Sequence, residues 1–152
     1  MIGLSLPPLN IPALLRQFGL RPSKGLGQNF LQDNRALQEI IARSEIGPAD
    51  DILEIGPGLG SLTRYLALAA HHVTAVELDK GLFPALETVI APYKNVHLVQ
   101  GDILKLEPAT LMFPPGLAGA AVRRLPAVIV GQAVGWSRYQ GEYVPSAELV
   151  AP

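Results

Sequence analysis

Apolar and polar positions along this chain predict short buried strands separated by helices. Strands are expected at Asp51 to Ile55, His72 to Glu77 and Asn95 to Val99. Between the strands, apolar residues recur at intervals of three and four, which is the spacing of an amphipathic helix. Strand, helix and strand in close alternation predict an α/β fold, with a parallel sheet, right-handed crossovers and flanking helices.

Two further helices are predicted ahead of the first strand. Residues 11–18 have helical spacing, with Pro12 in the first turn and Gly19 placed to end the helix. Asp33 can cap the second helix, and Gly47 lies just past its end. The shared apolar face of that second helix consists of Leu37, Ile40, Ile41 and Ser44.

The later part of the chain also contains residues that are expected to begin and end helices. Ser61 is expected to cap the helix after the first strand, and Asp79 is expected to cap the next one. Pro92 ends that helix. Leu125 to Val130 has the composition of a fourth strand, and beyond it no helical or strand period is sustained.

The first predicted strand runs into a glycine-rich loop, E-I-G-P-G-L-G, at residues 54–60. Glycine at every second position lets the backbone turn sharply and leaves no side chain between it and a ligand. Open α/β sheets bind ligands at this end of their strands. A dinucleotide fingerprint needs glycine at position 61, where this chain has Ser61, so the loop favours S-adenosylmethionine.

Acidic residues follow the next two strands. Glu77 ends the second strand, where a carboxylate can accept hydrogen bonds from both hydroxyls of an adenosine ribose. Asp102 follows the third, where it can accept from the amine of an adenine while Ile103 packs on the ring. The alternatives are a surface carboxylate at a strand end for Glu77 and a turn aspartate for Asp102.

Composition narrows the class of protein. The chain has 152 residues, of which 49% are hydrophobic and 16% are charged, and this is typical of one globular domain. No apolar run reaches the roughly 18 residues that a membrane span needs, and the N-terminus lacks the charges of a secretory signal. Cysteine is absent, which excludes disulfides and thiolate chemistry. We expect a soluble, cytoplasmic protein without a membrane partner.

Charge and isolated polar groups leave several alternatives open. The net charge of −1 does not indicate nucleic acid, but the first 35 residues are basic, which fits either a phosphate-facing segment or an ordinary solvated surface. The histidines show no metal-ligand spacing and are interpreted as structural or solvated, so no metal is expected. Three aromatic residues in the tail could stack a base or simply pack locally. These histidines and aromatic residues are His71, His72, His97, Trp136, Tyr139 and Tyr143.

Four motifs together resemble those of the ribosomal RNA adenine dimethyltransferase family. They are G-Q-N-F-L at residues 27–31, E-I-G-P-G-L-G at 54–60, V-E-L-D at 76–79 and G-D at 101–102. The resemblance covers about residues 20–105. It implies a Rossmann-like class I methyltransferase fold, S-adenosylmethionine as cofactor, and methylation of adenine N6 in the RNA of the small ribosomal subunit.

The resemblance also implies a set of cofactor-binding positions. Asn29 and Leu31 would cover the cofactor from the N-terminal side. Gly56 would lie against its methionine part, and Gly58 would shape the loop. With the ribose and adenine partners, the set is Asn29, Leu31, Gly56, Gly58, Glu77 and Asp102.

The chain departs from the family after residue 107. The family has an N-L-P-Y type motif after the fourth strand, whereas residues 130–136 read V-G-Q-A-V-G-W, so the catalytic residues are unassigned. Gln132 in this segment is one methylene longer than asparagine, and its amide could contact an amine. We expect an N-terminal extension at 1–22, a cofactor-binding half at 23–107, and an irregular segment at 108–152, with the fold truncated after about four strands or continued out of frame.

The sequence is therefore consistent with three functions. The first is an S-adenosylmethionine-dependent adenine dimethyltransferase acting on ribosomal RNA. The second is a non-catalytic fragment that binds the same cofactor. The third is a nicotinamide-dependent oxidoreductase, which Ser61 and the G-Q-N-F-L segment disfavour.

Overall fold

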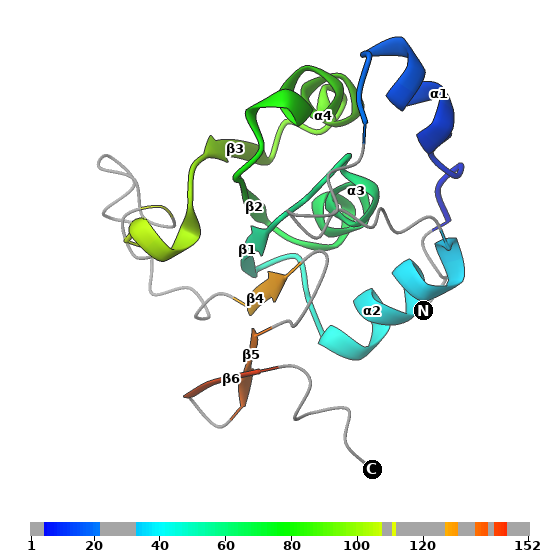
Figure 1. Ribbon diagram of the computed structural model, residues 1–152. Coiled ribbons are helices and arrows are strands. Elements are labelled where there is room, and N and C mark those ends of the chain that lie inside the picture. Colours follow the sequence, from blue (N-terminus) through cyan, green and yellow to red (C-terminus); the bar gives the residue numbers. More distant parts are fainter. Residues whose placement is uncertain are drawn as a thin grey trace.

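The fold is built on a parallel four-stranded sheet with strand order β3-β2-β1-β4 (Figure 1). The computed structural model describes residues 5–21, 33–107 and 111, with the backbone of 127–130, 136–139 and 142–145. The strands of the sheet are β1 Asp51–Ile55, β2 His72–Glu77, β3 Val96–Gln100 and β4 Ala127–Val130. The predicted α/β fold and parallel sheet are confirmed, with β3 starting one residue later than expected.

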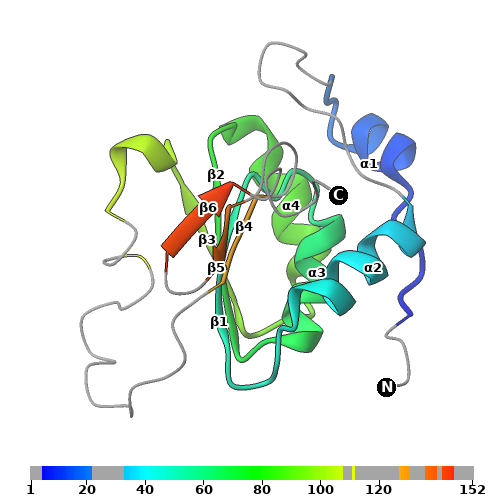
Figure 2. The same ribbon diagram turned by 90° about the horizontal axis from the view of Figure 1, so that it is seen from below.

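Helices lie together on one side of this sheet, as Figure 2 shows. Helices α3 and α4 connect successive strands, while α1 and α2 lie outside them. The helices are α1 Ile11–Gln17, α2 Asn34–Ser44, α3 Ser61–Ala69 and α4 Phe83–Ile90, with short 3-10 turns η2 Lys80–Leu82 and η3 Ile103–Lys105. The arrangement leaves the carboxyl ends of the strands at one edge of the sheet.

Two of the predicted helix boundaries are wrong. Ser61 does not cap α3: the residue before the helix is Gly60 at φ 88°, and within the described part of the chain no side chain caps it. Asp79 caps the short turn η2 instead of α4, whose preceding residue is Leu82. Helix α2 ends shortly before Gly47 as predicted, with Glu45 in the left-handed region at φ 54°. The Asp33 cap is confirmed, since its carboxylate accepts from the backbone N–H of Arg35 at 2.9 Å.

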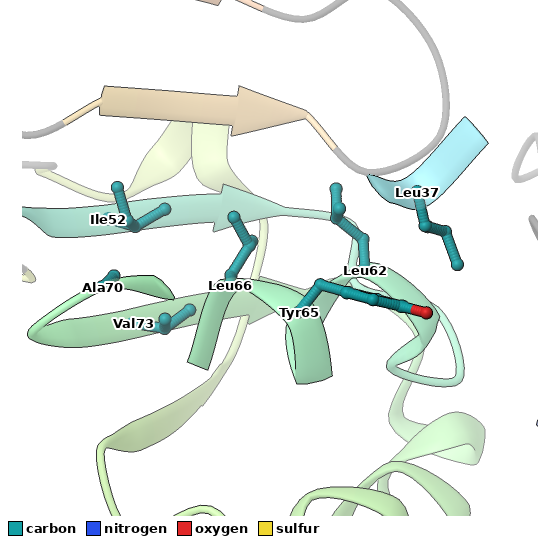
Figure 3. Close-up of a cluster of buried hydrophobic side chains, with 7 residues drawn as sticks. All are labelled: Leu37, Ile52, Leu62, Tyr65, Leu66, Ala70 and Val73. Atoms are coloured by element: carbon teal, nitrogen blue, oxygen red, sulfur yellow. The ribbon is translucent and has the colours of Figure 1, made fainter. Parts of the chain in front are cut away.

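The main hydrophobic core fills the space between the sheet and helices α2 and α3 (Figure 3). Tyr65 and Leu66 of α3 are fully buried there, together with Ile52 of β1 and Leu37 of α2. Each such side chain contributes about 1.5–3 kcal/mol relative to leaving it exposed. This core holds α3, and with it the end of the glycine loop, in a fixed place against β1.

A two-stranded antiparallel ribbon occurs where the sequence predicts an irregular segment. It consists of β5 Trp136–Tyr139 and β6 Glu142–Pro145. Strands of four residues are too short for an alternating pattern to stand out. Across the described residues, no helix is long and apolar enough to cross a membrane.

Candidate functional site

The glycine loop leaves β1 in a conformation that ordinary side chains disfavour. Gly56, Gly58 and Gly60 have φ values of 72°, 61° and 88°. This left-handed region carries little strain only for glycine. Gly56 donates its N–H to the carbonyl of Val76 at 2.9 Å, which ties the loop to β2. No described atom lies within 4 Å of a Cβ built on Gly56, so a ligand can approach the backbone there.

Glu77, the last residue of β2, joins the glycine loop to the turn that follows β2. Its Oε2 accepts from the N–H of Gly58 at 3.1 Å, and its Oε1 accepts from the N–H of Asp79 at 2.9 Å. The residue is only 6% exposed. Burial raises the pKa of Glu77 above its ordinary value, and the bonds from Asp79 and Gly58 lower it in part. The carboxylate is thus held in one orientation at the carboxyl edge of the sheet.

Asp102 lies beside Glu77, at the end of the neighbouring strand. Gly101 donates its N–H to the carbonyl of Glu77 at 3.0 Å, which fixes the two strand ends together. The Oδ1 atom of Asp102 accepts from the N–H of Leu104 at 3.0 Å and caps η3. Asp102 is therefore a turn residue, as one prediction had it. Because this bond engages one of its two carboxylate oxygens, a ligand role remains open to it as well.

Glu54 is a second buried acid near the site, and it was not predicted from the sequence. The Thr63 hydroxyl donates to its Oε2 at 2.6 Å, while Oε1 is buried with no hydrogen-bond partner among the described residues. Burial raises the pKa of Glu54 from 4.5 to about 7, the Thr63 bond opposes this, and the charge of Glu77 adds to it. The available signal was its alternation with Ile52, which puts a carboxyl on the helix-facing side of β1.

Glu54 makes stability depend on pH in a direction that can be checked. A folded pKa of about 7 lies above the ordinary 4.5, so its stabilising contribution is complete below about 4.5 and is lost as pH rises through 7. Glu54→Gln removes that loss. At pH 8 we expect the free energy of unfolding of the variant to be about 1–3 kcal/mol higher than that of the wild-type chain, because one pKa unit corresponds to about 1.4 kcal/mol.

Urea unfolding at pH 5 and pH 8 measures this difference. At pH 5 the two chains should be nearly equal in stability, apart from the altered bond to Thr63. Equal effects of the substitution at both pH values would contradict the assignment of a raised pKa to Glu54.

Histidines lie at the opposite, amino-terminal edge of the sheet. The Nδ1 atom of His71 lies 2.9 Å from Oδ1 of Asp51, an acidic partner that the linear spacing did not indicate. Burial lowers the pKa of His72, which begins β2. Among the described residues, no group of three or more histidine or acidic side chains could hold a metal ion.

Several predicted positions are not brought together by the described structure. Asn29, Leu31 and Gln132 lie outside the described residues. Of the tail aromatics, only the backbone is described: Trp136 and Tyr139 bound β5, and Tyr143 pairs with Arg138 across the ribbon. Of the proposed cofactor residues, the structure places Gly56, Gly58, Glu77 and Asp102 at one edge of the sheet.

This fold, with its glycine loop and an acid at the end of β2, is that of a Rossmann-like class I methyltransferase. Residues 20–123 match the family model described as ribosomal RNA adenine dimethylase, and the chain belongs to that family. The resemblance found from the sequence motifs is therefore confirmed.

Individual relatives agree with the family match. The chain is 48% identical over 105 residues to ribosomal RNA small subunit methyltransferase A of Lactiplantibacillus plantarum, covering 69% of this chain and 36% of that protein. The same enzyme of Moorella thermoacetica is 47% identical over 114 residues, covering 75% and 39%. Among solved structures, the 23S rRNA methyltransferase ErmE is 33% identical with a TM-score of 0.54, covering 67% and 36%. The chain thus spans little more than a third of these relatives.

Proposed function

We propose that this chain is the S-adenosylmethionine-binding part of an enzyme that dimethylates adenine N6 in the RNA of the small ribosomal subunit, working in the cytoplasm. One observation carries the proposal: the Glu77 carboxylate is fixed between the glycine loop and the turn that follows β2. The backbone carbonyl of Glu77 accepts from the N–H of Gly101, which puts Asp102 beside it. The family match supports the RNA substrate.

The residues present fit the cofactor. Each oxygen of Glu77 accepts one backbone N–H and keeps further lone pairs, so the carboxylate can still accept from both ribose hydroxyls. Asp102 would accept from the adenine amine. Space above Gly56 would take the methionine part, with Asn29 and Leu31 covering it from the N-terminal side. When bound, S-adenosylmethionine supplies a methyl group activated by its sulfonium.

The work of the chain's own residues is to bind and orient. The charge of Glu77 adds to the raised pKa of Glu54 on the adjacent strand, so the two carboxyl groups interact across β1 and β2. Holding the methyl donor in one place lowers the entropic cost of the transfer, and excluding water protects it. No residue of this chain is assigned to contact the target adenine.

Titration calorimetry tests the cofactor assignment. S-adenosylhomocysteine should bind the full chain and NAD should not. Binding of NAD in preference to S-adenosylhomocysteine would favour the oxidoreductase, and binding of neither would end the proposal.

Transfer of a labelled methyl group to unmodified small ribosomal subunits then tests the activity. Label in the adenines of the RNA would show a working dimethyltransferase. Cofactor binding without transfer would identify a non-catalytic cofactor-binding chain, which the V-G-Q-A-V-G-W segment at residues 130–136 favours.

A further inference from the structure

The N-terminal segment, residues 5–20, crosses the helical side of the molecule and is bonded to it. Leu6 donates its N–H to the hydroxyl of Tyr65 in α3 at 3.3 Å. The carbonyl of Leu6 accepts from Nδ2 of Asn34 in α2 at 2.8 Å. These bonds join residues far apart in the sequence, so the start of the segment is anchored on α2 and α3.

Arg64 of α3 binds the segment at the next residue, Pro7. Its Nη1 donates to the carbonyl of Pro7 at 2.9 Å. The side chain is buried, and its Nε and Nη2 have no hydrogen-bond partner among the described residues. Arg64 therefore anchors the segment at Pro7, and the rest of the attachment depends on contacts made further along the segment.

Those contacts are apolar and lie behind the glycine loop. Ile11, the first residue of α1, is 2% exposed and belongs to one buried cluster with Leu59, Leu82 and Ala85. Helix α1 lies near α4 in Figure 1. A helix of seven residues is not stable by itself, so this cluster keeps α1 helical. The partly buried residues around the cluster are Leu9, Leu14, Leu15, Phe18 and Leu20.

The cluster packs next to the two backbone segments whose N–H groups bind the Glu77 carboxylate. Leu59 is 1% exposed and directly follows Gly58, whose N–H donates to Oε2 of Glu77. Leu82 ends the short turn that Asp79 caps, and the N–H of Asp79 donates to Oε1. Filling the space between Leu59 and Leu82 therefore sets how the loop and the turn close around the carboxylate.

We propose that α1 is a positioning element for the cofactor site, with Ile11 as the positioning residue that acts through Leu59 and Leu82 on the Glu77 carboxylate. The inference rests on the proposed function, because it takes S-adenosylmethionine as the ligand of Glu77. A helix that served stability alone would change unfolding when altered and leave the affinity of the folded protein unchanged.

The test compares two cavities of similar size in different clusters. Ile11→Ala opens the cluster behind the glycine loop, whereas Leu37→Ala opens the main core between α2 and α3. Both are measured in the full chain by thermal unfolding and by calorimetric titration with S-adenosylhomocysteine, well below the unfolding temperature. Ile11→Val is the conservative variant, which keeps most of the contact.

Both alanine variants should lower the unfolding temperature. Only Ile11→Ala should also weaken binding, by about tenfold, which corresponds to about 1.4 kcal/mol. Ile11→Val should show a smaller but measurable loss, with an affinity between those of the wild-type chain and Ile11→Ala. If Ile11→Ala does not fold, a graded loss of affinity in Ile11→Val at unchanged folding supports the inference.

Three results separate the possible failures. Unchanged affinity in the folded Ile11 variants overturns the inference and leaves the proposed function intact. Equal loss of affinity in Leu37→Ala and Ile11→Ala also overturns it, because any loosening of the core would then suffice. Absence of binding in the wild-type chain overturns the proposed function itself.

Discussion

Glu77→Ala should abolish measurable binding of S-adenosylhomocysteine while the sheet stays folded. The substitution removes the acceptor for the ribose hydroxyls and also the acceptor for the N–H groups of Gly58 and Asp79. A hydrogen bond to a charged group contributes about 1.5–3 kcal/mol, so losing two such bonds weakens binding by at least about 100-fold. Calorimetric titration measures the affinity, and far-ultraviolet circular dichroism reports the fold.

Glu77→Gln is the matched control for this result. Glutamine keeps the length of the side chain and one carbonyl oxygen, so it can still accept from one of the two backbone N–H groups. We expect it to bind more weakly than the wild-type chain and more strongly than Glu77→Ala. Wild-type affinity in the alanine variant would remove Glu77 from the site.

Strands β1 and β2 were predictable to the residue because their signal is local. Each is a short, largely apolar run, which is typical of a strand buried on both faces of a parallel sheet. The helix boundaries were less predictable. Ser61 has the chemistry of a cap, but Gly60 in a left-handed conformation brings the chain out of the loop and takes the boundary position.

The site was predictable in its residues and less so in its contacts. The role of Glu77 followed from its place at a strand end, yet its two backbone bonds depend on how the glycine loop folds back over β2. Glu54 was missed because its partner Thr63 lies across the interface between β1 and α3. The link from Ile11 to Leu59 is a tertiary contact between distant segments, and no spacing in the chain encodes it.

Gly56→Ala should separate ligand binding from stability. A methyl group at Gly56 meets no described atom within 4 Å, so its cost to the folded chain is the backbone strain at φ 72°, about 1–2 kcal/mol. The same methyl group would stand where the methionine part of the cofactor is proposed to lie. We expect affinity for S-adenosylhomocysteine to fall by about 100-fold or more, equivalent to about 3 kcal/mol.

Gly60→Ala is the contrasting variant, because its methyl group should lower stability and have little direct effect on ligand binding. A Cβ at Gly60 would lie 3.0 Å from Cδ1 of Leu86 and 3.2 Å from Cγ1 of Val89, and φ there is 88°. Strain and overpacking together should lower the free energy of unfolding by about 2–4 kcal/mol. The ratio of lost affinity to lost stability should therefore be high for Gly56→Ala and low for Gly60→Ala. If the two variants show the same ratio in parallel unfolding and titration experiments, the open side of Gly56 does not face the ligand.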